Sequence, residues 1–200
     1  MGNTTITNFT NSGTIKSTGG VGVNIASGTT ISNLKNTGTI NGSDGVKVNS
    51  ATLQNLENSG TIKGNNNGVK VENGGKLETL NNRGTISGGS NGVILGANGY
   101  IKELNNYKEM GPVKVDGGTL KNLNNYGTIS GASGVYVLNY WNESDDPIKN
   151  IVNSGTIIST GPTTNYIPSE GLNGSILISG PFGKQIAVEK IDNQKNGGYI

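Results

Sequence analysis

Apolar residues recur in a fixed order along this chain, and polar turn-forming residues separate them. Each repeat has an apolar pair three residues apart, an Asn-x-Gly-Thr-Ile unit, and a Gly followed by two alternating Val residues. The middle unit is clearest as Asn-Ser-Gly-Thr-Ile at 58–62. Between its third positions, from Gly13 to Gly155, the steps are 25, 22, 24, 24, 19 and 28 residues. A period of about 20–50 residues is typical of solenoids, propellers and repeat arrays.

The third segment alternates with a period of two, so Val46 and Val48 face one side and Lys47 the other. β-Branched residues dominate the inward positions, which favours strands, and no window carries a helical pattern over helical length. Three short strands separated by Gly, Asn and Ser bends predict one coil of a parallel β-helix. Each strand would then pair with its copy one repeat later, at a spacing of about 4.8 Å.

We therefore predict an all-β, right-handed parallel β-helix of about seven to eight coils, with three short strands per coil. The predicted hand follows from the strong right-handed preference of parallel crossovers. Residues 1–200 would form a single β-helix fragment of a larger protein, interrupted by loop insertions at 139–147 and 159–173. After the second insertion, Ile176–Ile178 and then Val188, Ile191 and Asn193 resemble a degraded eighth repeat.

Stacking predicts columns of equivalent residues. The first position of the middle unit should form a ladder of amides that hydrogen-bond from coil to coil: Asn11, Asn36, Asn58, Asn82, Asn106, Asn125 and Asn153. The Gly column beside it should need either positive φ or close backbone approach. Lys108 replaces that Gly in one coil, so we expect local irregularity near 105–112. Lys47 and Lys70 should stack as like charges.

Two outward columns follow the ladder. The first consists of hydroxyls, Thr14, Thr39, Thr61, Thr85, Thr128 and Thr156, and the next is mixed, Lys16, Asn41, Lys63, Ser87 and Ser130. A flat Thr face is also a feature of ice-binding solenoids, but such a face needs paired Thr columns, and the mixed neighbour argues against it.

The composition argues against several classes of structure and function. Hydrophobic content is 31% and charged content 14%, yet the net charge of +2 and the regular spacing argue against disorder. The chain has no Cys and no His, hence no disulfide framework and neither the commonest metal ligand nor the commonest general base. We expect no cofactor. Fifteen basic against thirteen acidic residues, with Arg83 the single arginine, give no electrostatic basis for nucleic-acid binding.

The Asn-[Ser/Thr]-Gly-Thr-Ile repeats from Asn11 to Ile157 resemble the passenger domains of Gram-negative autotransporters, especially the adhesin-like passengers of Campylobacter and Helicobacter relatives. Similar Gly/Asn-rich repeats occur in filamentous haemagglutinins and phage tailspikes. The resemblance implies a right-handed β-helix, secretion across the outer membrane, a cell-surface location and a role in adhesion and virulence. It also implies a parent protein anchored by an outer-membrane barrel that lies outside these residues.

Aromatic residues are the main candidates for ligand binding. Arg83, Tyr107 and Tyr126 occupy one column in three successive coils, where outward rings would stack beneath a guanidinium. Tyr136, Tyr140 and Trp141 gather near the first insertion. Exposed aromatic groups often mark a binding site, although these side chains could instead cap the edge of a coil or anchor the loop.

Acidic residues in the first insertion are a second group of candidate site residues. Glu143, Asp145 and Asp146 cluster in the first insertion and are weak candidates for a hard cation such as Ca²⁺, although a solvated turn is the preferred explanation. We therefore expect a non-enzymatic surface segment that binds a glycan or protein of a host or neighbouring cell, or acts only as a spacer. The alternative is a carbohydrate-active β-helix enzyme or a tailspike-like module. Open strand edges at the ends of a solenoid also predict self-association.

Overall fold

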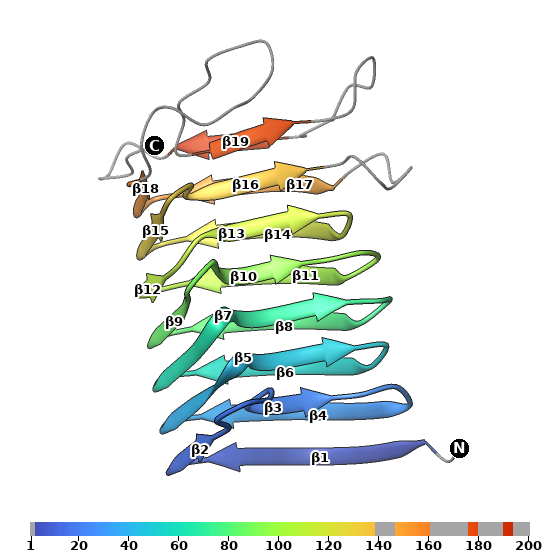
Figure 1. The fold of residues 1–200 in the computed structure, drawn as a ribbon. Coiled ribbons are helices and arrows are strands. Elements are labelled where there is room, and N and C mark those ends of the chain that lie inside the picture. Colours follow the sequence, from blue (N-terminus) through green and yellow to red (C-terminus); the bar gives the residue numbers. More distant parts are fainter. Residues whose placement is uncertain (1–2, 139–146, 161–175, 180–189, 194–200) are drawn as a thin grey trace.

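The computed structural model is a stack of β-strand coils, described for residues 3–138, 147–160, 176–179 and 190–193 (Figure 1). Strands pair in parallel with their counterparts in the neighbouring coil, as in β4 and β6, where Ile31 pairs with Leu53. The described residues contain no helix. The all-β parallel solenoid predicted from the repeats is thus confirmed, whereas its right-handed winding stays a prediction.

The first strand of each coil belongs to an eight-stranded sheet, in which the apolar pairs lie over one another. Its members, in stacking order, are β1 (Thr4–Asn11), β4 (Thr29–Asn36), β6 (Thr52–Asn58), β8 (Lys76–Asn82), β11 (Tyr100–Asn106), β14 (Thr119–Asn125), β17 (Ile148–Asn153) and β20 (Lys190–Asn193).

The second and third strands belong to one twelve-stranded sheet. The second strands are β2 (Thr14–Lys16), β9 (Thr85–Gly88), β12 (Glu109–Met110), β15 (Thr128–Gly131) and β18 (Thr156–Ser159). The third strands are β3 (Val23–Ile25), β10 (Asn91–Leu95), β13 (Val113–Asp116), β16 (Val135–Leu138) and β19 (Ile176–Ser179). In two coils, β5 (Thr39–Asn49) and β7 (Thr61–Glu72) run through the bend between these positions. Those two coils have two strands each, and the prediction of three is corrected there.

The coil count also differs from the prediction of seven to eight. Six coils, from β1 to β16, are described from end to end, and β17 to β20 are parts of two further coils. Ile176–Ser179 pairs with β16, so it completes the seventh coil and does not begin the eighth. Asn193 pairs with Asn153 and belongs to the eighth. Sequence reasoning missed this because the second insertion separates β18 from β19 within one coil.

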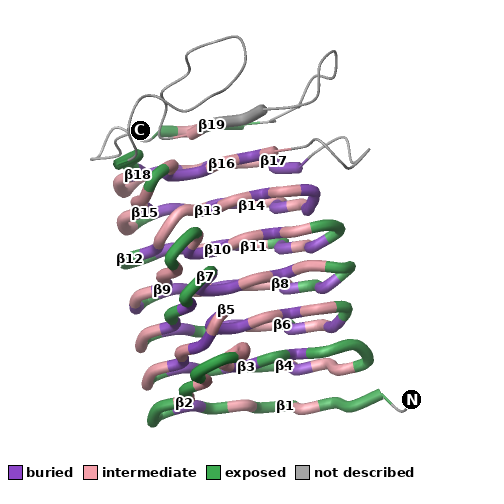
Figure 2. Tube along the Cα trace, in the orientation of Figure 1, coloured by how far each residue is buried: buried purple, intermediate pink, exposed green. Residues whose placement is uncertain are grey.

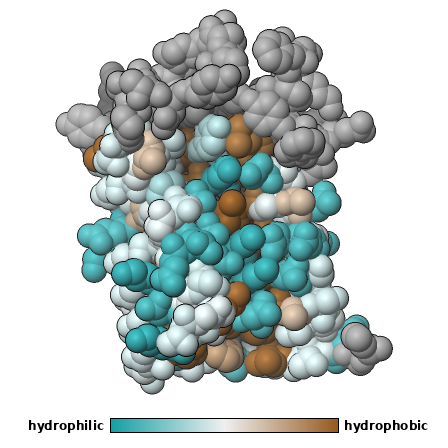
Figure 3. All heavy atoms as spheres, viewed as in Figure 1, coloured by the Kyte–Doolittle hydropathy of each residue, from teal (hydrophilic) through white to brown (hydrophobic). Residues whose placement is uncertain are grey.

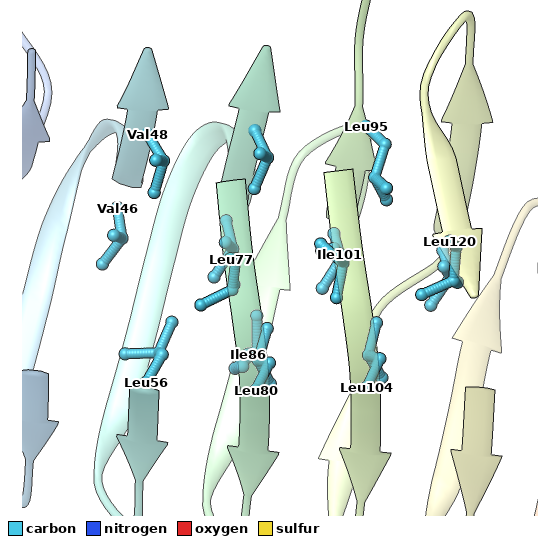
Figure 4. Close-up of a cluster of buried hydrophobic side chains, with 14 of the residues drawn as sticks. Val46, Val48, Leu56, Leu77, Leu80, Ile86, Leu95, Ile101, Leu104 and Leu120 are labelled. Carbon is cyan, nitrogen blue, oxygen red and sulfur yellow. The ribbon is translucent and has the colours of Figure 1, made fainter. Parts of the chain in front are cut away.

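Apolar side chains from all three strand positions fill the interior (Figure 4). Ile40 and Ile62 are paired neighbours in successive coils, and both are fully buried. Figure 2 shows the first coil largely exposed, because none of the described coils covers its outer edge. Ile6, Phe9 and Ile15 are accordingly only partly buried, although they pack against the core.

The asparagine ladder forms as predicted. Asn82 Nδ2, for example, donates to Asn106 Oδ1 at 2.9 Å and to the Glu109 carbonyl at 2.8 Å. Six of the seven predicted ladder residues are at most 1% exposed, and Asn11 in the first coil is 7% exposed. Asn153 Nδ2 extends the ladder to Asn193 Oδ1 at 3.1 Å. Each side-chain amide donates a hydrogen bond to the asparagine of the next coil, which satisfies polar groups that would otherwise be costly to bury.

The glycine column beside the ladder depends on close approach. A Cβ on Gly60 would lie 2.1 Å from the Gly38 carbonyl oxygen, and one on Gly84 would lie 2.1 Å from that of Gly60. Neither residue has positive φ. Of the two reasons the sequence left open for this column, backbone contact between coils is therefore the correct one.

Lys108 does not disturb the column that it enters. Glu109 pairs with Thr85 and Met110 with Ile86 in the regular parallel register, and Asn106 keeps its place in the ladder. The irregularity expected near 105–112 lies in the second half of that range, where β12 has only two residues. Its cause is the short connection through Gly111 and Pro112.

Candidate functional site

The predicted aromatic column forms at the bend between the first and second strands. The Tyr107 and Tyr126 rings stack with centroids 5.2 Å apart and planes 10° from parallel. The Arg83 Cζ atom lies 4.6 Å from the centre of the Tyr107 ring. Tyr107 is 42% exposed and Tyr126 is 49% exposed, so the stack is a surface feature. We refer to Arg83, Tyr107 and Tyr126 as the aromatic stack.

The ladder fixes the backbone beneath the stack. Each stack residue directly follows a ladder asparagine, and its amide donates to the carbonyl of the ladder residue one coil below. The distances are 2.7 Å from Arg83 N to Asn58 O, 2.8 Å from Tyr107 N to Asn82 O, and 2.7 Å from Tyr126 N to Asn106 O. Because the coils repeat at the spacing of a sheet, flat side chains at this position meet face to face.

Stacking determines which ring surfaces a ligand can reach. Arg83 covers one face of Tyr107 and Tyr126 covers the other, leaving the Tyr107 ring edge accessible. In the coil beyond Tyr126 the same position holds Ser154, whose side chain is too small to cover a ring. The outer face of Tyr126 and the edges of both rings are therefore the contact surface. The two rings and the guanidinium therefore stack as the sequence predicted.

The remaining aromatic candidates do not join the stack. Tyr136 lies on β16, in the outward column of the third strands, where the Lys114 Nζ atom is 5.9 Å from its ring centre. Tyr140 and Trp141 lie outside the described residues, as do the acidic candidates Glu143, Asp145 and Asp146. Among the residues that are described, no group of three or more acidic side chains could hold a metal ion.

Lys47 and Lys70 do stack, but they share an acidic partner. Glu72 Oε1 lies 2.7 Å from Lys47 Nζ, and Glu72 Oε2 lies 2.9 Å from Lys70 Nζ. Burial raises the pKa of Glu72, and the hydrogen bonds and charges of the two lysines outweigh it, so the pKa lies below its ordinary value. Glu72 thus offsets the repulsion predicted between the two lysines. Comparison of residues within one column could not show this, because Glu72 lies in a different column.

Several other side-chain contacts between coils were also missed. The Lys121 Nζ atom lies 5.8 Å from the Tyr100 ring centre on the outer face of the first sheet. A second amide ladder runs from Asp44 through Asn67 to Asn91, with distances of 2.8 and 2.9 Å. Unequal bend lengths put these residues at different offsets from the Gly-Thr-Ile unit, which hid the ladder in the sequence. Figure 3 shows one face of the molecule, on which hydrophilic and intermediate areas surround smaller hydrophobic patches.

Comparison of the chain with known protein families, with characterised proteins and with solved structures found no match. No helix in the described ranges is long and apolar enough to span a membrane. What the fold and the site define is a class: a parallel β-solenoid with an internal asparagine ladder and an exposed Arg-Tyr-Tyr stack on three adjacent coils.

Proposed function

We propose that this chain is a structural and adhesive segment of a larger cell-surface protein, of the autotransporter-passenger kind that its repeats resemble. Its coils serve as a stiff spacer, and the aromatic stack contacts a glycan or matrix protein of a host or neighbouring cell. No catalysis is required. The parent protein would be secreted and anchored at the Gram-negative outer membrane.

The observation that carries the adhesive role is the exposed aromatic stack. Tyr and Arg are enriched at the energetic centres of interfaces because they bring large contact areas at low conformational cost. Their backbone amides are held by ladder carbonyls at 2.7–2.8 Å, so this part of the backbone has little conformational freedom to lose on binding. Exposed rings beside hydroxyl-bearing columns also suit sugars, which have an apolar face and a polar edge.

A binding screen tests this function. We expect the 200-residue chain to bind members of a glycan and matrix-protein array, and Tyr107→Ala/Tyr126→Ala to weaken that binding by about tenfold, equivalent to ~1.4 kcal/mol. Tyr100→Ala is the matched control, because it removes a tyrosine that lies on the first sheet, away from the stack, and is not a candidate for ligand binding. Circular dichroism would check that each variant is folded.

Two other outcomes would support a different function. A folded chain that binds nothing on the array would leave only the spacer role. Cleavage of a polysaccharide that requires Ca²⁺ and is lost in Asp145→Ala/Asp146→Ala would instead support a carbohydrate-active enzyme.

A further inference from the structure

The fifth coil lacks the bend that its neighbours have between the second and third strands. Seven positions separate Ile86 from Val93 in the fourth coil, but three separate Met110 from Val113. The short path is held closed by the Gly111 amide, which donates to the Ile86 carbonyl at 2.9 Å, and by the Val93 amide, which donates to the Pro112 carbonyl at 3.1 Å. The missing bend leaves a gap in the surface between coils four and six.

This gap is a notch of about 440 Å³. Its floor is Met110, Gly111 and Pro112 of the fifth coil. One wall is Ser87–Ser90 of the fourth coil, and the other is Ser130–Ala132 of the sixth. The volume falls within the range of about 300–1,000 Å³ that is usual for small-molecule sites. The notch is thus large enough for one or two sugar rings. It lies along β9, β12 and β15, which are stacked in Figure 1.

The lining of the notch combines polar side chains with apolar surface from residues such as Pro112 and Ala132, and it carries one charge. Glu109 occupies the outward position where Thr stands in the coils on either side, and it is exposed. The Thr85 hydroxyl donates to Glu109 Oε2 at 3.4 Å. Hydroxyls of Ser87, Thr128 and Ser130 complete the lining. The notch therefore presents a carboxylate that accepts hydrogen bonds, and hydroxyls that can both donate and accept.

The notch adjoins the aromatic stack. Within each of the three coils, the stack residue precedes a notch residue by two positions: Arg83 and Thr85, Tyr107 and Glu109, Tyr126 and Thr128. At about 3.3 Å per residue along a strand, the two features are at most ~7 Å apart along the backbone. Three departures from the repeat, at Tyr107, Glu109 and the missing bend, thus coincide in one coil. Local departures from an otherwise consistent pattern tend to mark functional sites.

We infer that the notch is a subsite for a neutral pyranose unit of a glycan, with the Glu109 carboxylate accepting hydrogen bonds from the sugar hydroxyls and the stack contacting the adjoining unit. This inference rests on the proposed adhesive function and deepens it. A neutral sugar is favoured because an anionic one would place its charge beside Glu109. Hydrogen bonds to a carboxylate are also stronger than those between neutral groups.

Titration with methyl glycosides of galactose, mannose and N-acetylglucosamine, followed by ligand-observed NMR, tests the inference. We expect at least one glycoside to bind. Ser130→Trp should fill the notch and weaken binding at least tenfold. Glu109→Thr, which installs the residue of the neighbouring coils, should weaken it about fivefold. Asn41→Trp is the matched control: it lies in the same outward column as Ser130 but in the second coil, and should leave binding unchanged.

The outcomes separate this inference from the proposed function. If array binding requires Tyr107 and Tyr126 but survives both Ser130→Trp and Glu109→Thr, the adhesive role stands and the notch subsite is refuted. Preference for sialylated or sulfated sugars over all three neutral glycosides would likewise overturn it. If no glycoside binds, the inference fails, and the array with matrix proteins decides the adhesive role separately.

Discussion

At the scale of single residues, asparagine and glutamate show what a column can and cannot reveal. An amide carries both a donor and an acceptor, so a buried column of asparagines can continue without limit, and its recurrence predicted the ladder. Glu72 acts across columns. It lies two residues beyond Lys70 and one coil above Lys47, and it bonds both at 2.7–2.9 Å. Its side chain is only 16% exposed, which limits screening by solvent.

The two ion pairs of Glu72 predict that the free energy of unfolding depends on pH. Because the folded-state pKa of Glu72 lies below the ordinary value of 4.5, its contribution is present above that value and is lost as pH falls through the folded-state pKa. We expect Glu72→Gln to lower the free energy of unfolding by about 1 kcal/mol at pH 7. The difference from wild type should shrink toward zero in strong acid, as measured by urea denaturation at several pH values.

Glu57→Gln serves as the control for Glu72. Glu57 is exposed and forms no ion pair with the described residues, so its removal should change stability little at any pH. An equal loss at pH 7 and in strong acid for Glu72→Gln would show that the carboxylate charge does not contribute.

At the scale of the strand and its bend, backbone contact between coils restricts which residues the bend after the first strand can hold. The bend after the first strand brings the backbones of successive coils together, so a Cβ on Gly38, Gly60 or Gly84 would meet the carbonyl oxygen of the coil beneath. Lys108 is the exception: its side chain enters this column while the register of β12 is kept. The next bend behaves differently, since coils with six, seven or three positions between the strands all keep the core aligned.

A pair of glycine substitutions tests the close approach. In Gly60→Ala the new methyl group would meet the Gly38 carbonyl at 2.1 Å, so we expect a loss of about 1–3 kcal/mol in the free energy of unfolding. Gly13→Ala, in the same column of the first coil, meets nothing within 4 Å and should stay within about 0.5 kcal/mol of wild type. Denaturant unfolding of both variants decides the point; equal losses would exclude coil contact as the cause.

At the scale of the whole molecule, the solenoid is regular in its interior and open at its first coil. Among the described strands, β1 is the edge of its sheet, and none of them pairs with its outer side. Ile6, Phe9 and Ile15 remain only partly buried there. Unpaired strand edges with apolar residues behind them are templates for another chain. The same architecture places the aromatic stack and the notch on three coils that are joined by continuous parallel strand pairing.

The open edge predicts association of this 200-residue chain. Sedimentation velocity should show species larger than the monomer as concentration rises. Thr7→Lys/Thr10→Lys, at exposed positions of β1, should suppress them, because charge on an edge strand opposes pairing. Ser32→Lys/Gln54→Lys adds the same charge on interior coils and should not. A wild-type chain that stays monomeric at all concentrations would contradict the prediction.

The sequence by itself determined the fold, the core columns, the asparagine ladder and the alignment of Arg83, Tyr107 and Tyr126. Each of these depends only on the period, since residues one repeat apart lie over one another in any parallel solenoid. The tertiary structure alone decided the rest. Contacts between columns, such as Glu72 with two lysines, depend on side-chain directions that a period does not specify. The notch arises because the fifth coil omits a bend while its neighbours keep theirs. The 19-residue step showed the shortening, but only the stacked neighbours turn a missing loop into a notch with two walls.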